Sequence, residues 1–373
     1  MTLPSPSNSP AKILFISHTK KQCGVHEFGL SIAEAIKKST KYSFVYAECS
    51  SPEELIATVE GVNPSAIIYN YYPSTMSWLE KSLTARFPIP QLGIMHECTQ
   101  AAADAADTSL FDYHIAPDPT LAPVNPIVFK TGRVIPSYEN RWPAPAVTTV
   151  GSMGFATQGK GFERLIIAVQ EEFDEAIIRL HIPAGDFADT SVADLVARCR
   201  ALVSKDGVKL VTSHEFLEKE QLLDFLAQNT LNAFFYDKCE GRGISSAIEN
   251  ALAVRRPLAI TRSYMFRHVL SNNSSVAEPP ICIEPDGDGH ISVKEKIYIR
   301  LKRQQYSRTT QNELPLHWFL KPQMSLKQII ENGVEPLLPF YDLWSELNLI
   351  KDYERILSEV FKTREQRILQ RAG

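Results

Sequence analysis

The sequence lacks long apolar runs, and its first ten residues lack the features of a secretory signal. No apolar segment approaches the roughly 20 residues that a membrane-spanning helix needs. The first ten residues are rich in serine and proline, with neither a cationic start nor a hydrophobic region. We therefore expect a cytoplasmic protein without a membrane-spanning helix.

The sequence also lacks paired cysteines. The six cysteines are scattered and form no Cys-x-x-Cys pair, so neither a zinc site nor a disulfide framework has a basis in their spacing. Because thiols stay reduced in the cytosol, we expect free cysteines and no bound metal. They are Cys23, Cys49, Cys98, Cys199, Cys239 and Cys282.

There is no surplus of positive charge. Lys and Arg number 39 against 43 Asp and Glu, which gives a net charge of -4. Non-specific binding to nucleic acid needs excess cations that displace condensed counterions, so we expect no nucleic-acid partner. With 44% hydrophobic and 22% charged residues, the chain falls among ordinary globular proteins rather than disordered ones. Its 373 residues exceed one typical core and predict two domains.

In the first third of the chain, short apolar runs alternate with amphipathic stretches. This alternation predicts parallel βαβ units and an open sheet that is covered on both faces. The expected strands span residues 12–17, 42–47, 65–71, 91–95, 111–116 and 126–129, and the expected helices 27–38, 52–59 and 76–87.

A proline-rich stretch with Pro136, Pro143 and Pro145 interrupts the pattern and predicts an interdomain linker. The βα alternation then resumes, which predicts a second sheet domain. Its expected strands span residues 147–153, 176–182, 208–211, 231–235 and 257–261, and its helices 162–170, 191–203, 219–228 and 245–253.

The last quarter of the chain has a weaker pattern. Residues 294–308 are rich in Lys and Arg, which favours a solvated face and leaves open a peripheral contact with an anionic membrane surface. Residues 340–371 have helical spacing, with Trp344, Leu347 and Tyr353 on one apolar face. We expect domains at 1–140 and 141–335, and a terminal helix within 336–373 that packs back on the first domain. The sequence gives no oligomeric state.

Ligands of open α/β sheets bind beyond the carboxyl ends of the strands, which directs attention to the loops there. Gly24 lies between the first strand and a helix, where backbone N–H groups favour an anion. His96-Glu97 directly follows another strand. No loop has the G-x-G-x-x-G spacing, which disfavours a dehydrogenase.

Two loops of the second domain favour phosphate binding. The turn Gly154–Gly161 contains Lys160 and matches G-x-x-x-x-G-K, but Gly161 replaces the hydroxyl residue that holds Mg²⁺ in a P-loop. Lys160 still suits a phosphate without a metal. The second loop has Arg242, Gly243, Ser245 and Ser246 before a helix that carries Glu249, an acceptor suited to ribose hydroxyls.

These loops and the segment 213–217 resemble the C-terminal domain of GT-B glycosyltransferases of the retaining glycosyltransferase family 4. The order of the pieces matches too, and the resemblance covers roughly residues 12–270. It implies an α/β GT-B fold with two Rossmann-like domains and an interdomain cleft. It also implies transfer of a sugar from a nucleoside diphosphate sugar to a glycan, lipid-linked or other small-molecule acceptor, with retention and without a metal or other cofactor.

The resemblance also implies roles for individual residues. Lys160 would bind the donor diphosphate and Glu249 the ribose, Glu240 would face the transferred sugar, and His96 would contact that sugar. Gly24 would correspond to the family's glycine loop. The residues implied to meet the phosphates are Arg242, Gly243, Ile244, Ser245 and Ser246.

Three residues depart from the family pattern. Phe155 stands where the family has an arginine, Glu240 and Glu249 are one residue further apart than usual, and Glu97 replaces an aspartate. Two alternatives therefore stay open. One is a P-loop-like ATP- or GTP-dependent enzyme built around Lys160, and the other is an inactive GT-B-like protein that only binds a sugar nucleotide.

Overall fold

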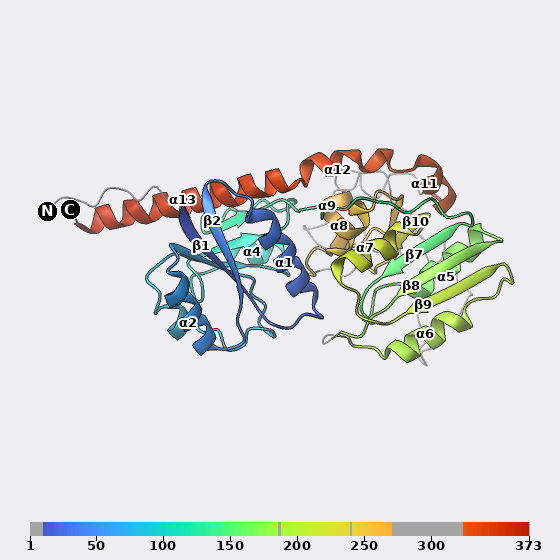
Figure 1. Cartoon of the computed structure of the whole chain (residues 1–373), viewed down its shortest axis with the longest axis horizontal. Helices are drawn as coiled ribbons and strands as arrows, with labels where there is room; N and C mark the ends of the chain where they lie inside the picture. Colours follow the sequence, from blue (N-terminus) through green and yellow to red (C-terminus); the bar gives the residue numbers. More distant parts are fainter. Residues whose placement is uncertain (1–9, 186–187, 239–240, 271–323, 373) are drawn as a thin grey trace, which may run out of the picture. The chain divides into compact units, whose positions relative to one another are not determined.

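The computed structural model describes residues 10–185, 188–238, 241–270 and 324–372 (Figure 1). The chain forms two compact units. The first comprises Met1–Pro136, Gly241–Ser246 and Phe340–Gly373, and the second comprises Ser137–Glu240 and Ala247–Pro339. Glu240, Cys239, Cys282 and the basic segment 294–308 lie outside the described residues.

The first unit contains a six-stranded parallel sheet with strand order β2-β1-β3-β4-β5-β6. All six predicted strands are confirmed, with shifts of a few residues at their ends. They are β1 (Ala11–Ser17), β2 (Tyr42–Glu48), β3 (Ala66–Tyr69), β4 (Gln91–Ile94), β5 (Tyr113–Ala116) and β6 (Val128–Lys130). The helices of this unit are α1 (Gly24–Ile36), α2 (Pro52–Val62), α3 (Lys81–Thr84), α4 (Gln100–Asp104) and α13 (Glu346–Ala372).

The sheet of the first unit is buried on both faces, which explains the unbroken apolar run in β1. Ile13 and Phe15 pack with α1 and α13 on one face, and Leu14 and Ile16 pack with α2 on the other. Figure 1 shows α13 beside α1, and the two helices contact each other. Leu347, expected on the buried face of the terminal helix, is instead 59% exposed. It lies six residues before Tyr353 in α13, which at about 3.6 residues per turn puts it on a different face of the helix.

The predicted helix 76–87 is wrong for most of its length. Only Lys81–Thr84 is helical, and the N–H groups of Thr75 and Met76 both bond the carbonyl of Tyr72 in a turn. Met76, Leu79 and Leu83 are nevertheless buried in the same cluster. The apolar spacing therefore predicted correctly which side chains are buried, but not the helix, since a series of turns makes the same contacts.

The second unit contains a five-stranded parallel sheet with strand order β11-β10-β7-β8-β9. The predicted strands are again confirmed, as β7 (Thr149–Met153), β8 (Ala176–His181), β9 (Val208–Ser213), β10 (Leu231–Phe234) and β11 (Leu258–Ile260). The helices are α5 (Phe162–Glu172), α6 (Val192–Ala201), α7 (Lys219–Ala227), α8 (Ala247–Ala253), α9 (Arg267–Leu270) and α11 (Leu326–Asn332). Two further segments, Tyr264–Phe266 and Glu335–Leu337, are 3₁₀ turns. The first two residues of α12 (Leu338–Leu343) belong to the second unit and the others to the first.

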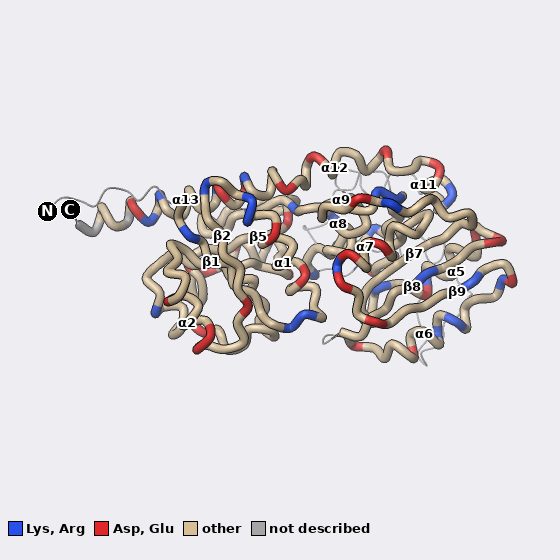
Figure 2. The backbone as a smooth tube through the Cα atoms, viewed as in Figure 1, with Lys and Arg blue, Asp and Glu red and all other residues tan. Residues whose placement is uncertain are grey.

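Local capping signals explain where several helices begin. The Ser51 side chain accepts a hydrogen bond from the Glu54 N–H at the start of α2, and Ser191 does the same for Asp194 at the start of α6. In the second unit, α5 and α6 pack with β7 and β8 in one large apolar cluster that also takes in α11. Figure 2 shows acidic and basic residues interspersed over the described parts of both units.

Candidate active site

Asn70 and His96 follow neighbouring strands of the first unit and are hydrogen-bonded to each other. The Asn70 amide nitrogen donates to the carbonyl of Val25 at 2.8 Å and to Ser17 Oγ at 2.9 Å, and Asn70 Oδ1 lies 2.7 Å from His96 Nε2. A carbonyl only accepts, so the NH₂ of Asn70 must face Val25 and the amide oxygen must face His96. His96 therefore donates through Nε2–H.

His96 is held as a neutral imidazole. Burial, followed by the charges of Arg133 and His18, lowers the pKa of His96 to about 3. The edge of its ring meets the ring of Phe28, with centroids 5.1 Å apart. His96 as a residue is nevertheless half-buried rather than fully enclosed. His96 therefore has the accessibility and the charge state of a group that accepts a hydrogen bond from a ligand.

Arg133 connects Phe28 to the segment 241–246, which belongs to the first unit. Its guanidinium lies 5.1 Å from the centre of the Phe28 ring, and it donates to the carbonyl of Pro117 at 3.0 Å and to Ser246 Oγ at 3.1 Å. Arg133 is 4% exposed. It therefore places a buried positive charge close to His96.

The segment 241–246 also contacts His96-Glu97 directly. Arg242 Nε lies 2.7 Å from Glu97 Oε1, and the Tyr72 hydroxyl donates to Glu97 Oε2 at 3.2 Å. A Cβ built on Gly243 would lie 2.1 Å from the carbonyl oxygen of His96, so only glycine fits there. The structure thus brings His96, Arg242 and Gly243 together.

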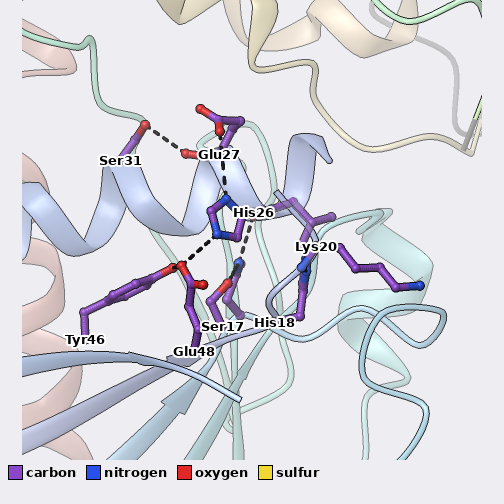
Figure 3. Close-up of polar contacts among 10 residues, drawn as sticks. Ser17, His18, Lys20, His26, Glu27, Ser31, Tyr46 and Glu48 are labelled. Atoms are coloured by element: carbon purple, nitrogen blue, oxygen red, sulfur yellow. Dashed lines mark hydrogen bonds and ion pairs between the residues drawn. The ribbon is translucent and has the colours of Figure 1, made fainter. Parts of the chain in front are cut away.

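Gly24 is the first residue of α1, and a Cβ built on it would have no atom within 4 Å. Two buried histidines lie near it, His18 in the loop before α1 and His26 in the first turn of α1 (Figure 3). His26 Nε2 lies 2.8 Å from Glu48 Oε1, to which the Tyr46 hydroxyl also donates at 3.0 Å. Burial tends to raise the pKa of Glu48, but the hydrogen bonds from His26 and Tyr46 outweigh it and lower that pKa.

His18 directly follows β1 and begins this loop (Figure 3). Its Nδ1 accepts a hydrogen bond from the Lys20 N–H at 3.2 Å, and burial, followed by the charges of His26 and Lys20, lowers the pKa of His18 to about 4. Neutral His18 and the contact between His26 and Glu48 thus stabilise the loop before α1. The start of the helix leaves open space at Gly24.

In the second unit, Lys160 lies beside the glycine turn that follows β7. Its ammonium is 4.0 Å from the centre of the Tyr236 ring. A Cβ on Gly154 would lie 3.6 Å from the Tyr236 hydroxyl and 3.7 Å from Lys160 Cδ. The turn, the lysine and the tyrosine therefore form one compact group at the carboxyl end of a parallel sheet, where such folds bind ligands.

Gly161 is the N-cap of α5 and has a left-handed backbone with φ of 66°. A Cβ there would lie 1.9 Å from the carbonyl oxygen of Phe235, so the position accepts no side chain. A P-loop requires a hydroxyl residue at this position to hold Mg²⁺. The backbone geometry thus gives a physical reason for the glycine and disfavours the P-loop alternative.

Phe155, one of the three departures from the family pattern in the sequence, packs on Gly185. A Cβ on Gly185 would lie 2.5 Å from the Phe155 ring. Another arginine, Arg164 of α5, pairs with Asp237 and bonds the carbonyl of Phe235. Phe155 therefore contributes packing to the turn rather than charge.

Glu249 lies in the first turn of α8 and is 4% exposed. Its Oε1 is 3.5 Å from Nε2 of the equally buried His268. Ser245 is buried and Ile244 half-buried just before this helix. The structure thus places Glu249 in a polar contact with His268 of α9.

Asn70, Tyr236 and Arg133 belong to these groups and were not predicted from the sequence. Asn70 directly follows β3, but the predicted strand 65–71 included it, so the rule that directed attention to His96 did not select it. Tyr236 directly follows the predicted strand 231–235, and that rule applies to it. Arg133 has no such signal, because its position is set only by contacts with residues distant in the chain.

Two searches of the described residues gave negative results. No group of three or more His, Cys, Asp or Glu side chains within the described ranges is placed to hold a metal ion. None of the described helices combines the length and the apolar character needed to cross a bilayer. The four described cysteines, at positions 23, 49, 98 and 199, are free thiols.

The chain matches no protein-family model and no curated protein sequence. Solved structures resemble it along nearly their whole length. HepE of Anabaena, in complex with UDP and glucose, has a TM-score of 0.58 at 11% identity and covers 93% of this chain and 99% of its own. Sucrose-phosphate synthase of Thermosynechococcus elongatus has a TM-score of 0.55 at 12% identity, with coverages of 95% and 100%.

A glycosyltransferase of Rickettsia africae gives a similar result, with a TM-score of 0.56, 10% identity, and coverages of 95% and 99%. Together with the two all-parallel sheets, these similarities define the fold. The chain has the α/β fold of the GT-B glycosyltransferases, as the resemblance implied.

Proposed function

We propose that this protein is a glycosyltransferase that moves a sugar from a nucleoside diphosphate sugar to an acceptor hydroxyl. The observation that carries the proposal is the group formed by Lys160, Gly154 and Tyr236 at the carboxyl end of β7, in a chain with a GT-B fold. Solved structures of that fold include complexes with UDP and with UDP-glucose, which makes a uridine donor the first to test.

Lys160 supplies a positive charge where the donor diphosphate is proposed to bind. When the sugar leaves, negative charge develops on the departing diphosphate, and a preorganised cation stabilises that charge in the transition state. The N-terminus of α5, directly after the turn, adds the positive end of a helix dipole. These two sources of positive charge support our proposal that the transfer needs no metal ion.

His96 is proposed to contact the transferred sugar. Its neutral ring offers an acceptor nitrogen, which suits a sugar hydroxyl better than a phosphate oxygen. Gly24 leaves room for close approach to the backbone at the start of α1. We further propose retention of the anomeric configuration, and we keep Glu249 as the proposed ribose ligand and Gly243 to Ser246 as proposed phosphate contacts.

A thermal-shift panel tests the donor proposal. Wild-type protein is heated with UDP, GDP, TDP, CMP or ATP, each with Mg²⁺ and with EDTA, because a ligand at a hundred times its Kd stabilises by about 2.7 kcal/mol. We expect a shift with one nucleoside diphosphate that is the same in EDTA. Lys160→Ala should reduce the shift to about half or less, since a 10- to 100-fold weaker Kd leaves about 0.4–1.4 kcal/mol. Lys209→Ala, at an exposed position on β9, should keep the full shift.

The outcomes separate the proposal from its alternatives. A shift with ATP only, dependent on Mg²⁺, would favour a P-loop-like enzyme. Nucleotide binding without release of nucleoside diphosphate from any sugar donor, across a panel of glycan and lipid-linked acceptors, would favour an inactive GT-B-like protein. Where transfer is found, the anomeric proton coupling of the product reports retention or inversion.

A further inference from the structure

The hydrogen bonds of the Asn70 side chain connect three separate elements of the first unit. Asn70 is fully buried, and its three polar contacts reach Ser17 at the end of β1, Val25 in α1 and His96 after β4. A Cβ on Gly29 would lie 2.1 Å from the Asn70 amide nitrogen, so α1 carries a glycine where this side chain passes. The amide thus ties the first turn of α1 to the imidazole.

The orientation of the Asn70 amide determines which nitrogen of His96 carries the proton. The Val25 carbonyl fixes the NH₂ end, so the oxygen end accepts the Nε2–H of His96. In a neutral imidazole the other nitrogen, Nδ1, then has a lone pair. Nδ1 makes no hydrogen bond within the part of the chain that the structure describes.

We propose that Asn70 is a positioning residue that holds His96 in the Nε2–H tautomer and so presents the Nδ1 lone pair to a hydroxyl of the substrate. The contact with a substrate hydroxyl rests on the proposed function, whereas the tautomer does not. A sugar hydroxyl can donate to Nδ1, and a fully ionised phosphate oxygen cannot. Asn70 thereby makes this part of the site selective for a hydroxyl.

Long-range ¹H–¹⁵N correlation spectra of the full chain, labelled with ¹⁵N-histidine, read the tautomer directly. The His96 signals are assigned by their loss in His96→Gln. We expect the Nε2–H pattern at neutral pH and no titration of His96 down to pH 5. A dominant Nδ1–H pattern in the wild-type protein would overturn the proposal.

Asn70→Leu removes the acceptor, and Asn229→Leu is a matched control. Asn229 is also fully buried, donates to Phe225 and Asn232, and lies where a Cβ on Gly151 would come within 1.9 Å. Both variants should lose comparable stability, but only Asn70→Leu should give His96 a mixture of tautomers. An unchanged His96 pattern in Asn70→Leu, or the same mixture in Asn229→Leu, would contradict a specific role.

Asn70→Asp keeps an oxygen that accepts the same proton and adds a negative charge. It should preserve the Nε2–H pattern and raise the pKa of His96 so that the ring titrates above pH 5. If Asn70→Leu does not fold, this variant and the wild-type spectrum decide the question. An Asn70→Asp protein whose His96 adopts the Nδ1–H pattern would overturn the proposal.

Activity gives a separate readout. In Asn70→Leu we expect kcat to fall about tenfold, the equivalent of one hydrogen bond, with the Kd for UDP unchanged. If no donor is turned over by the wild-type protein, the proposed function fails, and the spectra still decide the tautomer. An equal loss of UDP binding and kcat would contradict a role at the sugar.

Discussion

Replacing Gly161 by alanine tests the backbone of the glycine turn. The residue has φ of 66° and ψ of 28°, a left-handed conformation that costs alanine about 1–2 kcal/mol. The new Cβ would also lie 1.9 Å from the carbonyl oxygen of Phe235, a residue that is 1% exposed. Forcing a group into a packed interior costs about 1–3 kcal/mol more. We therefore expect a loss of about 2–5 kcal/mol in the free energy of unfolding.

Urea unfolding followed by circular dichroism measures this loss against a matched control. Asn63 has φ of 50° and ψ of 62° in the same left-handed region, and it already carries a Cβ. Asn63→Ala should therefore cost only about 1 kcal/mol. If Gly161→Ala loses no more than Asn63→Ala, the close approach of Gly161 to Phe235 does not exist and the reasoning is refuted.

The serine variant extends the same test to function. Gly161→Ser completes the G-x-x-x-x-G-K-S pattern of a P-loop. We expect a loss of stability like that of Gly161→Ala and no binding of ATP with Mg²⁺. Acquired Mg²⁺-dependent ATP binding in a stably folded variant would restore the P-loop alternative.

Further predictions concern the ligand groups and pH. Lys160→Ala should weaken UDP binding by about 10- to 100-fold, since a hydrogen bond to a charged group contributes about 1.5–3 kcal/mol. Titration calorimetry measures the change in Kd, and an unchanged Kd would mean that the diphosphate binds elsewhere. Tyr236→Leu removes the ring under that ammonium and should weaken UDP binding about threefold, a loss of about 0.5–1 kcal/mol that Tyr236→Phe should not share. In Gly24→Ala the new Cβ has room, so Tm should stay the same or rise slightly. The KM for the donor should rise, because the Cβ would obstruct a ligand that approaches the backbone there. Burial lowers the pKa of His18 and of His181 to about 4, so the unfolded chain binds more protons between pH 6.5 and 4. Stability should therefore be highest above pH 6.5 and fall as the pH decreases to 4, and His181→Gln should flatten this dependence in urea titrations at pH 7.5 and 5.

The sheets were predictable because their strands are buried on both faces. The run from Ile13 to Ile16 has no polar interruption, which leaves few structures other than a covered strand. The helix predicted around Met76 and Leu79 was wrong, because side chains buried at helical spacing do not require helical hydrogen bonds. Periodicity reports which side chains face the core, and it reports the backbone only when a single conformation satisfies that pattern.

Local motifs were found in the sequence, and contacts between distant residues were not. Lys160 lies within a glycine turn that is complete in eight residues, so the pattern is visible in the sequence. The role of Asn70 depends on Ser17, Val25 and His96, and no spacing rule connects those positions. Arg242 was expected to contact a phosphate. In the structure it contacts Glu97, because the segment 241–246 packs within the first unit. Such contacts depend on the whole topology rather than on a motif.

The terminal helix also constrains how the protein is made. Lys38 pairs with Glu346, and Ser39 donates to Glu354, across more than 300 residues of chain. Tyr353 and Ile356 complete the apolar cluster around Phe15. At 5–20 residues per second, a ribosome needs roughly 15–60 s to make the intervening chain. The core of the first unit therefore closes only after the residues of α13 that belong to it have been synthesised. During that interval, its exposed apolar face is the part of the nascent chain that a chaperone would bind.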